Sequence, residues 1–243
     1  NYWSFAITGK VRHPLILSFA DLQRFPVESF HSAITCSATH EARPIMSEAD
    51  WRGVPLRALL DEIAVDSTAQ YARVHAADGY TTLLPFGALA ETWLVYERNG
   101  AALTHEEGFP ARLIAPGLHG YKMPKWVNRV ELSASADGGF WERYGWSVEG
   151  EADVRATILS DELVNGVLHL SGAAYAGRQA LTAVEVSVDG GDWMPVTFAA
   201  AAPFALTHWE IQWTPPAAGD YSVRVRATAA GKHAEYAEMI RVR

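Results

Sequence analysis

The sequence changes character near residue 150, and this change restricts the fold more than any other feature. Residues 1 to about 145 mix helix-like and strand-like patterns, whereas the residues after about 150 alternate apolar and polar side chains. A stretch rich in glycine and acidic residues connects the two parts. We therefore expect two domains, 1–147 and 148–243. The alternating segments, which predict a β-sandwich in the second domain, are 167–173, 183–193, 207–213 and 221–227.

The first domain is expected to combine short strands with short helices. Ser18 and Asp21 have the spacing of a helix N-cap and its third helical residue, and Pro26 ends this helix. Residues 51–63 predict a turn followed by an amphipathic helix with Pro55 near its first turn. Strand-like patterns cover 2–9, 30–35, 71–76, 93–97, 111–116 and 126–132.

The overall charge narrows the class of partner. The 243 residues carry a formal net charge of −8, which argues against a nucleic-acid partner and favours a small ligand or a basic protein. No apolar run approaches the roughly 18–20 residues of a membrane span. The chain begins with Asn1 rather than Met and shows no signal peptide. We expect a processed chain from the periplasm or another extracytoplasmic compartment, without excluding the cytoplasm.

Cys36 is the only cysteine, so its thiol packs in a core, acts as a nucleophile or redox sensor, or ligates a soft metal. It lies just past a predicted strand and is followed by small polar residues, which lets another group approach closely. No cysteine or histidine set has zinc spacing. Catalysis by a Cys–His pair stays open with several histidines, namely His31, His40, His75, His105 and His119.

A second group of residues surrounds Arg112, which lies within an apolar strand pattern. A buried arginine stays charged and needs an anionic partner. A glycine-bearing loop over 116–120 follows, and Lys122 and Lys125 lie beside it. This combination suits a phosphate. A solvated basic loop over a structural arginine–carboxylate pair explains the spacing equally well.

Short motifs in matching order and spacing resemble the molybdopterin-dependent sulfite oxidase family over nearly the whole chain. They are Ile34-Thr35-Cys36, Trp51-Arg52-Gly53-Val54-Pro55-Leu56, Tyr96-Glu97-Arg98-Asn99-Gly100, Gly108-Phe109-Pro110-Ala111-Arg112-Leu113, Pro116-Gly117 through Gly120, and Lys125-Trp126. The resemblance implies an α+β sulfite-oxidase-type molybdopterin-binding domain. An all-β immunoglobulin-like sandwich, often used for dimerisation, is implied for the second domain.

The resemblance also implies a molybdenum–molybdopterin cofactor and assigns the site residues. Cys36 is the one protein ligand to molybdenum. The expected cofactor-binding residues, with the pterin phosphate held by Arg112 and Lys125, are Glu107, Arg112, His119, Lys122, Met123, Pro124 and Lys125. Tyr144 is the nearest candidate for the catalytic tyrosine, although Trp146 competes with it. Arg178 of the second domain is a further catalytic candidate.

Three departures from the family pattern bear on the substrate. Glu41 stands where sulfite-oxidising members carry an arginine that binds the substrate anion, and a carboxylate there would repel sulfite. Glu107 replaces a histidine or asparagine five residues before the pterin arginine. An arginine–asparagine–histidine segment of the family would precede residue 1.

These features favour an oxidoreductase that transfers an oxygen atom to or from a small substrate, either sulfite or a sulfoxide-like compound. Its electrons would pass singly to a separate haem protein, such as a cytochrome or a membrane haem subunit. A homodimer through the second domain is also expected. The alternative from another class is a non-catalytic module of the same fold that serves binding or assembly, and a Cys–His hydrolase is a third hypothesis.

Overall fold

The computed structural model describes residues 3–36 and 45–243, which form two compact units. The first unit contains the described residues up to Ile34 together with Ala49–Glu151. The second contains those between Thr35 and Glu48 together with Ala152–Arg243. The boundary after Glu151 lies close to the expected one after residue 147. The sequence pattern did not indicate that the segment around Cys36 groups with the second unit.

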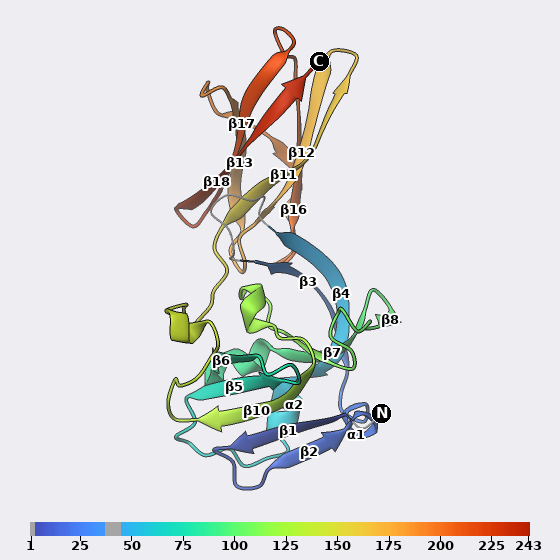
Figure 1. The fold of residues 1–243 in the computed structure, drawn as a ribbon, viewed down its shortest axis with the longest axis vertical. Helices are drawn as coiled ribbons and strands as arrows, with labels where there is room; N and C mark the ends of the chain where they lie inside the picture. The colour runs from blue at the N-terminus through green and yellow to red at the C-terminus, as the bar shows by residue number, and fades with distance from the viewer. Residues whose placement is uncertain (1–2, 37–44) are drawn as a thin grey trace. The chain divides into compact units, whose positions relative to one another are not determined.

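A five-stranded sheet in the first unit has the order β2-β1-β10-β5-β6 (Figure 1). Its strands are β1 (Ser4–Gly9), β2 (Leu15–Ser18), β5 (Tyr71–Ala76), β6 (Thr81–Pro85) and β10 (Val127–Ser133). β1 pairs in parallel with β10, and the other neighbours are antiparallel. The short helix α1 (Phe19–Leu22) follows β2 and carries the predicted capping box of Ser18 and Asp21.

A second sheet has the order β3-β4-β7-β8, with β9 also paired to β7. Its strands are β3 (Glu28–Thr35), β4 (Met46–Pro55), β7 (Trp93–Arg98), β8 (Ala101–Ala102) and β9 (Arg112–Ile114). The predicted turn at 51–55 is wrong, because these residues continue β4. Helix α2 (Leu56–Leu60) then begins with Pro55 as its N-cap and is shorter than predicted. The single-turn helices are η1 (Phe86–Glu91), η2 (Gly120–Lys122) and η3 (Glu142–Tyr144).

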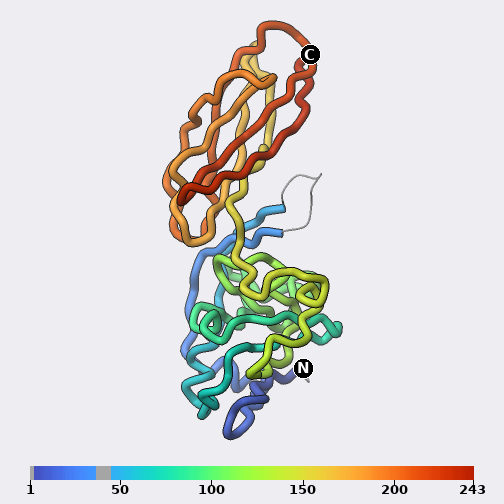
Figure 2. The backbone as a smooth tube through the Cα atoms, turned by 90° about the vertical axis from the view of Figure 1, so that its left-hand side faces the viewer, coloured from blue at the N-terminus to red at the C-terminus, as the bar shows by residue number. Residues whose placement is uncertain are grey.

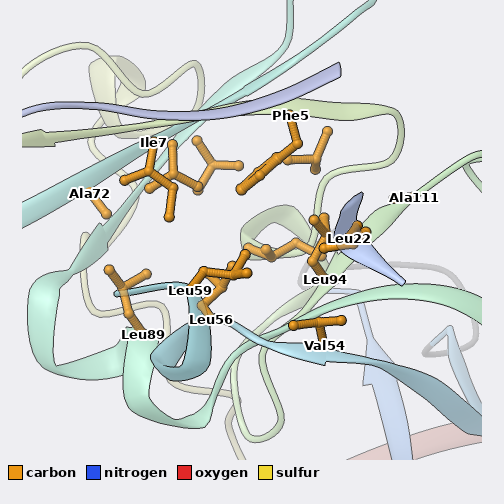
Figure 3. Close-up of a cluster of buried hydrophobic side chains, with 14 of the residues drawn as sticks. Phe5, Ile7, Leu22, Val54, Leu56, Leu59, Ala72, Leu89, Leu94 and Ala111 are labelled. Atoms are coloured by element: carbon orange, nitrogen blue, oxygen red, sulfur yellow. The ribbon is translucent and has the colours of Figure 1, made fainter. Parts of the chain in front are cut away.

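Apolar side chains from β1, α1, β4 and α2 meet in the main core of the first unit (Figure 3). Phe5 and Ile7 point to the same face because they alternate along β1, and both are fully buried. Leu56 and Leu59 bury one side of α2 against them. Each such side chain contributes about 1.5–3 kcal/mol relative to an exposed one. This core fixes β4 and β7, which carry residues of the site.

The second unit consists of two four-stranded sheets, and its chain runs back and forth in long strands (Figure 2). One sheet has the order β11-β12-β16-β15 and the other β14-β13-β17-β18. Side chains from both sheets, including Trp209 and Val225, form one buried core. The strands are β11 (Arg155–Val164), β12 (Val167–Tyr175), β13 (Leu181–Val188), β14 (Met194–Pro195), β15 (Thr197–Phe198), β16 (Thr207–Trp213), β17 (Gly219–Ala229) and β18 (Lys232–Val242).

The protein is mostly β, with 52% strand and 9% helix, so the α+β description fits its first unit only loosely. The helices are single turns or little more, whereas the strands carry the core. Within the described ranges, no helix has the length and apolar character needed to cross a membrane.

Candidate cofactor-binding site

Arg112 is the central residue of the site. It opens β9, whose other residues are buried and apolar, and its own side chain is withdrawn from solvent, with the residue 8% exposed. Its Nη1 donates to the carbonyl of Glu107 at 3.1 Å and its Nη2 to the carbonyl of Met123 at 3.2 Å. Among the described residues, Nε of Arg112 has no hydrogen-bond partner. The predicted alternative of an arginine–carboxylate pair therefore does not describe this guanidinium within the described part of the chain.

Burial and, to a smaller extent, the nearby charge of Arg98 lower the pKa of Arg112 to about 10, although Glu107 opposes the shift. The group is still a cation at neutral pH. A buried cation held by neutral carbonyls, with one donor unsatisfied, is stabilised by an anion. The geometry therefore fits a phosphate.

Gly108 brings the main chain against both basic side chains of the predicted phosphate site. Its φ of +109° lies in a region that other residues rarely adopt. A Cβ at this position would lie 2.8 Å from Cβ of Lys125 and 3.1 Å from Cβ of Arg112. Lys125 is half-buried, and its Nζ lies 5.8 Å from the ring centroid of Trp126. The structure thus brings Arg112, Lys125 and the 107–108 main chain together.

Glu107 is compatible with this basic site because its carboxylate bonds to Arg98 and to the amide of Thr104. Thr104 and Glu107 have the T-x-x-E spacing of a capping box. Oε2 of Glu107 accepts from N of Thr104 at 2.9 Å, and N of Glu107 donates to Oγ1 of Thr104 at 3.3 Å. Oε1 accepts from Nη1 of Arg98 at 2.6 Å. The Thr104 amide, followed by Arg98, lowers the pKa of Glu107, so the carboxylate is charged and only its carbonyl serves Arg112.

Trp51 and Arg98 also belong to the site, although the sequence pattern gave them no role there. Trp51 is buried, and its Nε1 donates to the carbonyl of Ser32 at 3.1 Å. The guanidinium carbons of Arg112 and Arg98 lie 5.4 Å and 5.8 Å from its ring centroid. Both distances permit a cation–π interaction. We call Trp51, Arg98, Glu107 and Arg112 the arginine cluster.

Lys122 departs from the prediction of a phosphate contact. Its Nζ donates to Oε1 of Glu142 at 2.5 Å and to the carbonyl of Leu83 at 2.6 Å, and the side chain is fully buried. A buried ammonium requires such a partner. Lys122 therefore anchors the loop that carries Met123, and the sequence could not reveal this because the partner lies twenty residues later.

The main chain of Met123 and Pro124 bonds to residues of β9. The Met123 carbonyl accepts from Arg112, and the Pro124 carbonyl accepts from N of Leu113 at 2.9 Å. His119 is buried, and its amide donates to the carbonyl of Gly150 at 2.8 Å. These bonds place the loop that contains Met123 and Pro124 against the strand that begins with Arg112.

The other candidates are found on separate elements of the two units. Tyr144 lies in η3 and is 71% exposed. Arg178 belongs to the second unit, where its guanidinium carbon lies 5.1 Å from the ring centroid of Phe204. Cys36 directly follows β3 in the same unit, and its amide donates to the carbonyl of Ile45 at 3.0 Å. Glu41 lies outside the described residues.

Comparisons with known proteins support the interpretation of the site. Residues 1–141 match the family of the oxidoreductase molybdopterin binding domain. The uncharacterized oxidoreductase YuiH of Bacillus subtilis is 36% identical over 151 residues, which cover 61% of this chain and 74% of YuiH. The crystal structure of the sulfane dehydrogenase SoxCD from Paracoccus pantotrophus superposes with a TM-score of 0.85 at 26% identity, covering 95% of this chain and 68% of that one.

Longer or differently organised relatives match in part. The nitrate reductase [NADH] of Solanum lycopersicum is 26% identical over 57% of this chain, but the match covers only 19% of the enzyme. The putative protein-methionine-sulfoxide reductase subunit YedZ1 of Azospira oryzae is 32% identical over 40% of this chain and 38% of its own length.

The chain belongs to the family of oxidoreductases with a molybdopterin-binding domain. It is a molybdopterin-dependent oxidoreductase of the sulfite-oxidase type, and its cofactor is molybdenum–molybdopterin, as predicted. The buried, partly unsatisfied guanidinium of Arg112 and the Gly108 main chain fit the phosphate end of that cofactor. These features do not support the hypotheses of a Cys–His hydrolase or a non-catalytic module.

Proposed function

We propose that the protein transfers an oxygen atom to or from a small sulfur compound, with Cys36 as the single protein ligand to molybdenum. When bound, the cofactor supplies the two-electron oxygen-atom chemistry. A thiolate suits a soft or high-valent metal, and the bond from the Cys36 amide to Ile45 fixes the main chain that carries it. Arg112 and Lys125 bind the phosphate, and the carbonyls of Glu107 and Met123 hold Arg112 in place.

The observation that carries this proposal is the unsatisfied Nε of Arg112 in a residue that is 8% exposed. A guanidinium buried in this way without an anion would cost several kcal/mol. A phosphate supplies both the missing acceptor and the opposite charge.

We propose an uncharged sulfoxide-like substrate in preference to sulfite. Glu41 stands where sulfite-oxidising members have an arginine, and a carboxylate in a dry pocket repels an anion. YedZ1, one of the partial relatives, is named as a putative protein-methionine-sulfoxide reductase subunit. Sulfite remains the second candidate, because SoxCD, which is similar over most of this chain, is named a sulfane dehydrogenase and therefore acts on a sulfur compound.

We further propose a separate haem protein as electron partner, an extracytoplasmic location, and a homodimer formed through an immunoglobulin-like second unit. The two four-stranded sheets that share one core support that architecture. Mixing the protein with a reduced or oxidised cytochrome and following the haem spectrum tests the electron partner, and light scattering tests the dimer.

Molybdenum analysis of the full chain, purified from a host that makes the cofactor, tests the central proposal. We expect molybdenum and pterin in equal amounts, loss of molybdenum in Cys36→Ser, and loss of pterin in Arg112→Gln. Arg241→Gln is the control for loss of a positive charge in the second unit, because Arg241 is exposed and has no expected role in the site. Wild-type protein that contains neither molybdenum nor pterin would contradict the proposal.

The substrate is tested with redox dyes, using sulfite and a dialkyl sulfoxide in parallel. We expect sulfoxide reduction by the wild type, and an increase of sulfite oxidation in Glu41→Arg. Efficient sulfite oxidation by the wild type would eliminate the preference for an uncharged substrate without affecting the cofactor assignment.

A further inference from the structure

Arg98 has no place in the predicted site, yet it shares two features with Arg112, namely contact with Trp51 and a buried Nε without a partner among the described residues. It ends β7, and the register of β4 and β7 pairs it directly with Trp51. Its guanidinium lies against the same indole as that of Arg112. Nε of Arg98, like Nε of Arg112, is buried and has no hydrogen-bond partner among the described residues.

Two guanidiniums beside one ring repel each other, and the pKa of Arg112 reflects the charge of Arg98. Glu107 offsets the charge of one guanidinium through its 2.6 Å bond to Nη1 of Arg98. Lys125, which Gly108 brings beside Arg112, adds a further cation. The described side chains of this region therefore leave an excess of positive charge, and a phosphate monoester with about −1.5 to −2 charges at pH 7 would balance it.

We propose that Arg98 is a second phosphate-binding arginine, which Glu107 holds in the orientation needed to act together with Arg112. Trp51 contacts both guanidiniums, and the planar fork of each suits a phosphate. Glu107 is then a positioning residue. Its carboxylate orients Arg98, its carbonyl orients Arg112, and its capping box with Thr104 fixes the loop between them. This inference rests on the proposed cofactor site.

The same strand pair offers a matched control. Arg52 and Glu97 are cross-strand neighbours, and Nη1 of Arg52 donates to Oε1 of Glu97 at 2.7 Å. Arg52 also lies near an aromatic ring, 6.0 Å from the centroid of Tyr96. Arg52→Gln therefore removes a cation, a carboxylate contact and a cation–π contact one position away from the arginine cluster.

Binding of inorganic phosphate to the cofactor-free full chain tests the inference, followed as the rise of the unfolding temperature with phosphate concentration. We expect Arg98→Gln to weaken phosphate binding about tenfold, as for loss of one charge-assisted hydrogen bond. Arg112→Gln should weaken it at least as much, and Arg52→Gln should match the wild type. Glu107→Gln keeps an acceptor for Thr104 but turns an amide NH2 toward Arg98, which then loses its orienting partner, so phosphate should bind more weakly.

Release of the pterin from loaded protein, measured by its fluorescence after oxidation, gives a second readout. We expect faster release from Arg98→Gln than from Arg52→Gln. If Arg98→Gln behaves like Arg52→Gln while Arg112→Gln weakens binding, the role of Arg98 is refuted and the cofactor site stands. If Arg112→Gln also has no effect on phosphate or pterin, the proposed function itself fails. If Arg98→Gln does not fold, unchanged or tighter phosphate binding by Glu107→Gln would refute the inference.

Discussion

Nζ of Lys122 and Oε1 of Glu142 lie 2.5 Å apart in an ion pair whose side chains are 0% and 5% exposed. Oε1 of Glu142 also accepts from Oγ1 of Thr82 at 2.7 Å and from N of Leu83 at 3.0 Å. One carboxylate oxygen thus joins β6, the loop that leads to Met123, and η3. The pair therefore stabilises the loop that carries Met123, although neither side chain hydrogen-bonds to Arg112.

Removing one member of this pair should destabilise the protein strongly. Lys122→Met leaves a buried carboxylate without its cation, and we expect a loss of about 3–5 kcal/mol in the free energy of unfolding. Urea denaturation measures it. The double variant Lys122→Met with Glu142→Leu should lose less than Lys122→Met alone. As the control, Arg241→Met breaks an exposed pair with Asp220 and should leave stability unchanged.

The same carboxylate should make stability depend on pH in the acid range. Burial raises the pKa of Glu142, but the hydrogen bonds from Lys122, Leu83 and Thr82 outweigh burial and lower it below its ordinary 4.5. A lowered folded-state pKa contributes stability that is present above the unfolded-state value. This contribution is lost as the pH falls through the folded-state pKa. Below pH 4.5, the free energy of unfolding should therefore change less steeply with pH for Glu142→Gln than for the wild type. Equal slopes for the two proteins would contradict the assignment.

Gly108→Ala should damage the cofactor site as well as the fold. The positive φ costs about 1–3 kcal/mol for a residue with a Cβ, and that Cβ would press on Lys125 and Arg112. We expect lower stability together with a lower pterin content in purified protein. Gly100→Ala is the matched control, because Gly100 has a φ of +78° with open space around its Cβ position. Equal pterin content in the two variants would refute a specific role for Gly108.

Glu48 should stabilise the second unit through two bonds. Its Oε2 accepts from N of Leu206 and its Oε1 lies 2.9 Å from Nε2 of His208. Glu48→Ala should lower stability by about 1–2 kcal/mol and increase hydrogen exchange at the Leu206 amide. Asp50→Asn, which affects an exposed contact with His31 on the same hairpin, should leave that exchange rate unchanged.

Local patterns in the sequence were sufficient to predict many of the strands and the capping box at Ser18. Alternation along β5 and β7 is a short-range feature, and the structure confirms both strands. The extension of β4 through Pro55 was missed, because a proline before a leucine-rich run favours a helix start locally. The helix does begin after Pro55, but pairing with β7 extends the strand up to that point.

The burial of Arg112 was predictable, because this residue lies within an apolar strand pattern. The orientation of Glu107 was not predictable, since it depends on Arg98 on another strand and on a capping box with Thr104. The role of Trp51 follows from cross-strand register, and the partner of Lys122 follows from the path of the chain beyond β10. Such long-range contacts leave no local periodicity in a single sequence.

The parallel pairing of β1 with β10 has a consequence for biosynthesis. Ala6 is aligned with Arg129, so β1 cannot pair with β10 until most of the first unit has left the ribosome. Pairings so distant in sequence form late in folding. This partner strand, β10, follows Lys125 in the sequence. The sheet that contains β1 is therefore complete only after synthesis has passed β10.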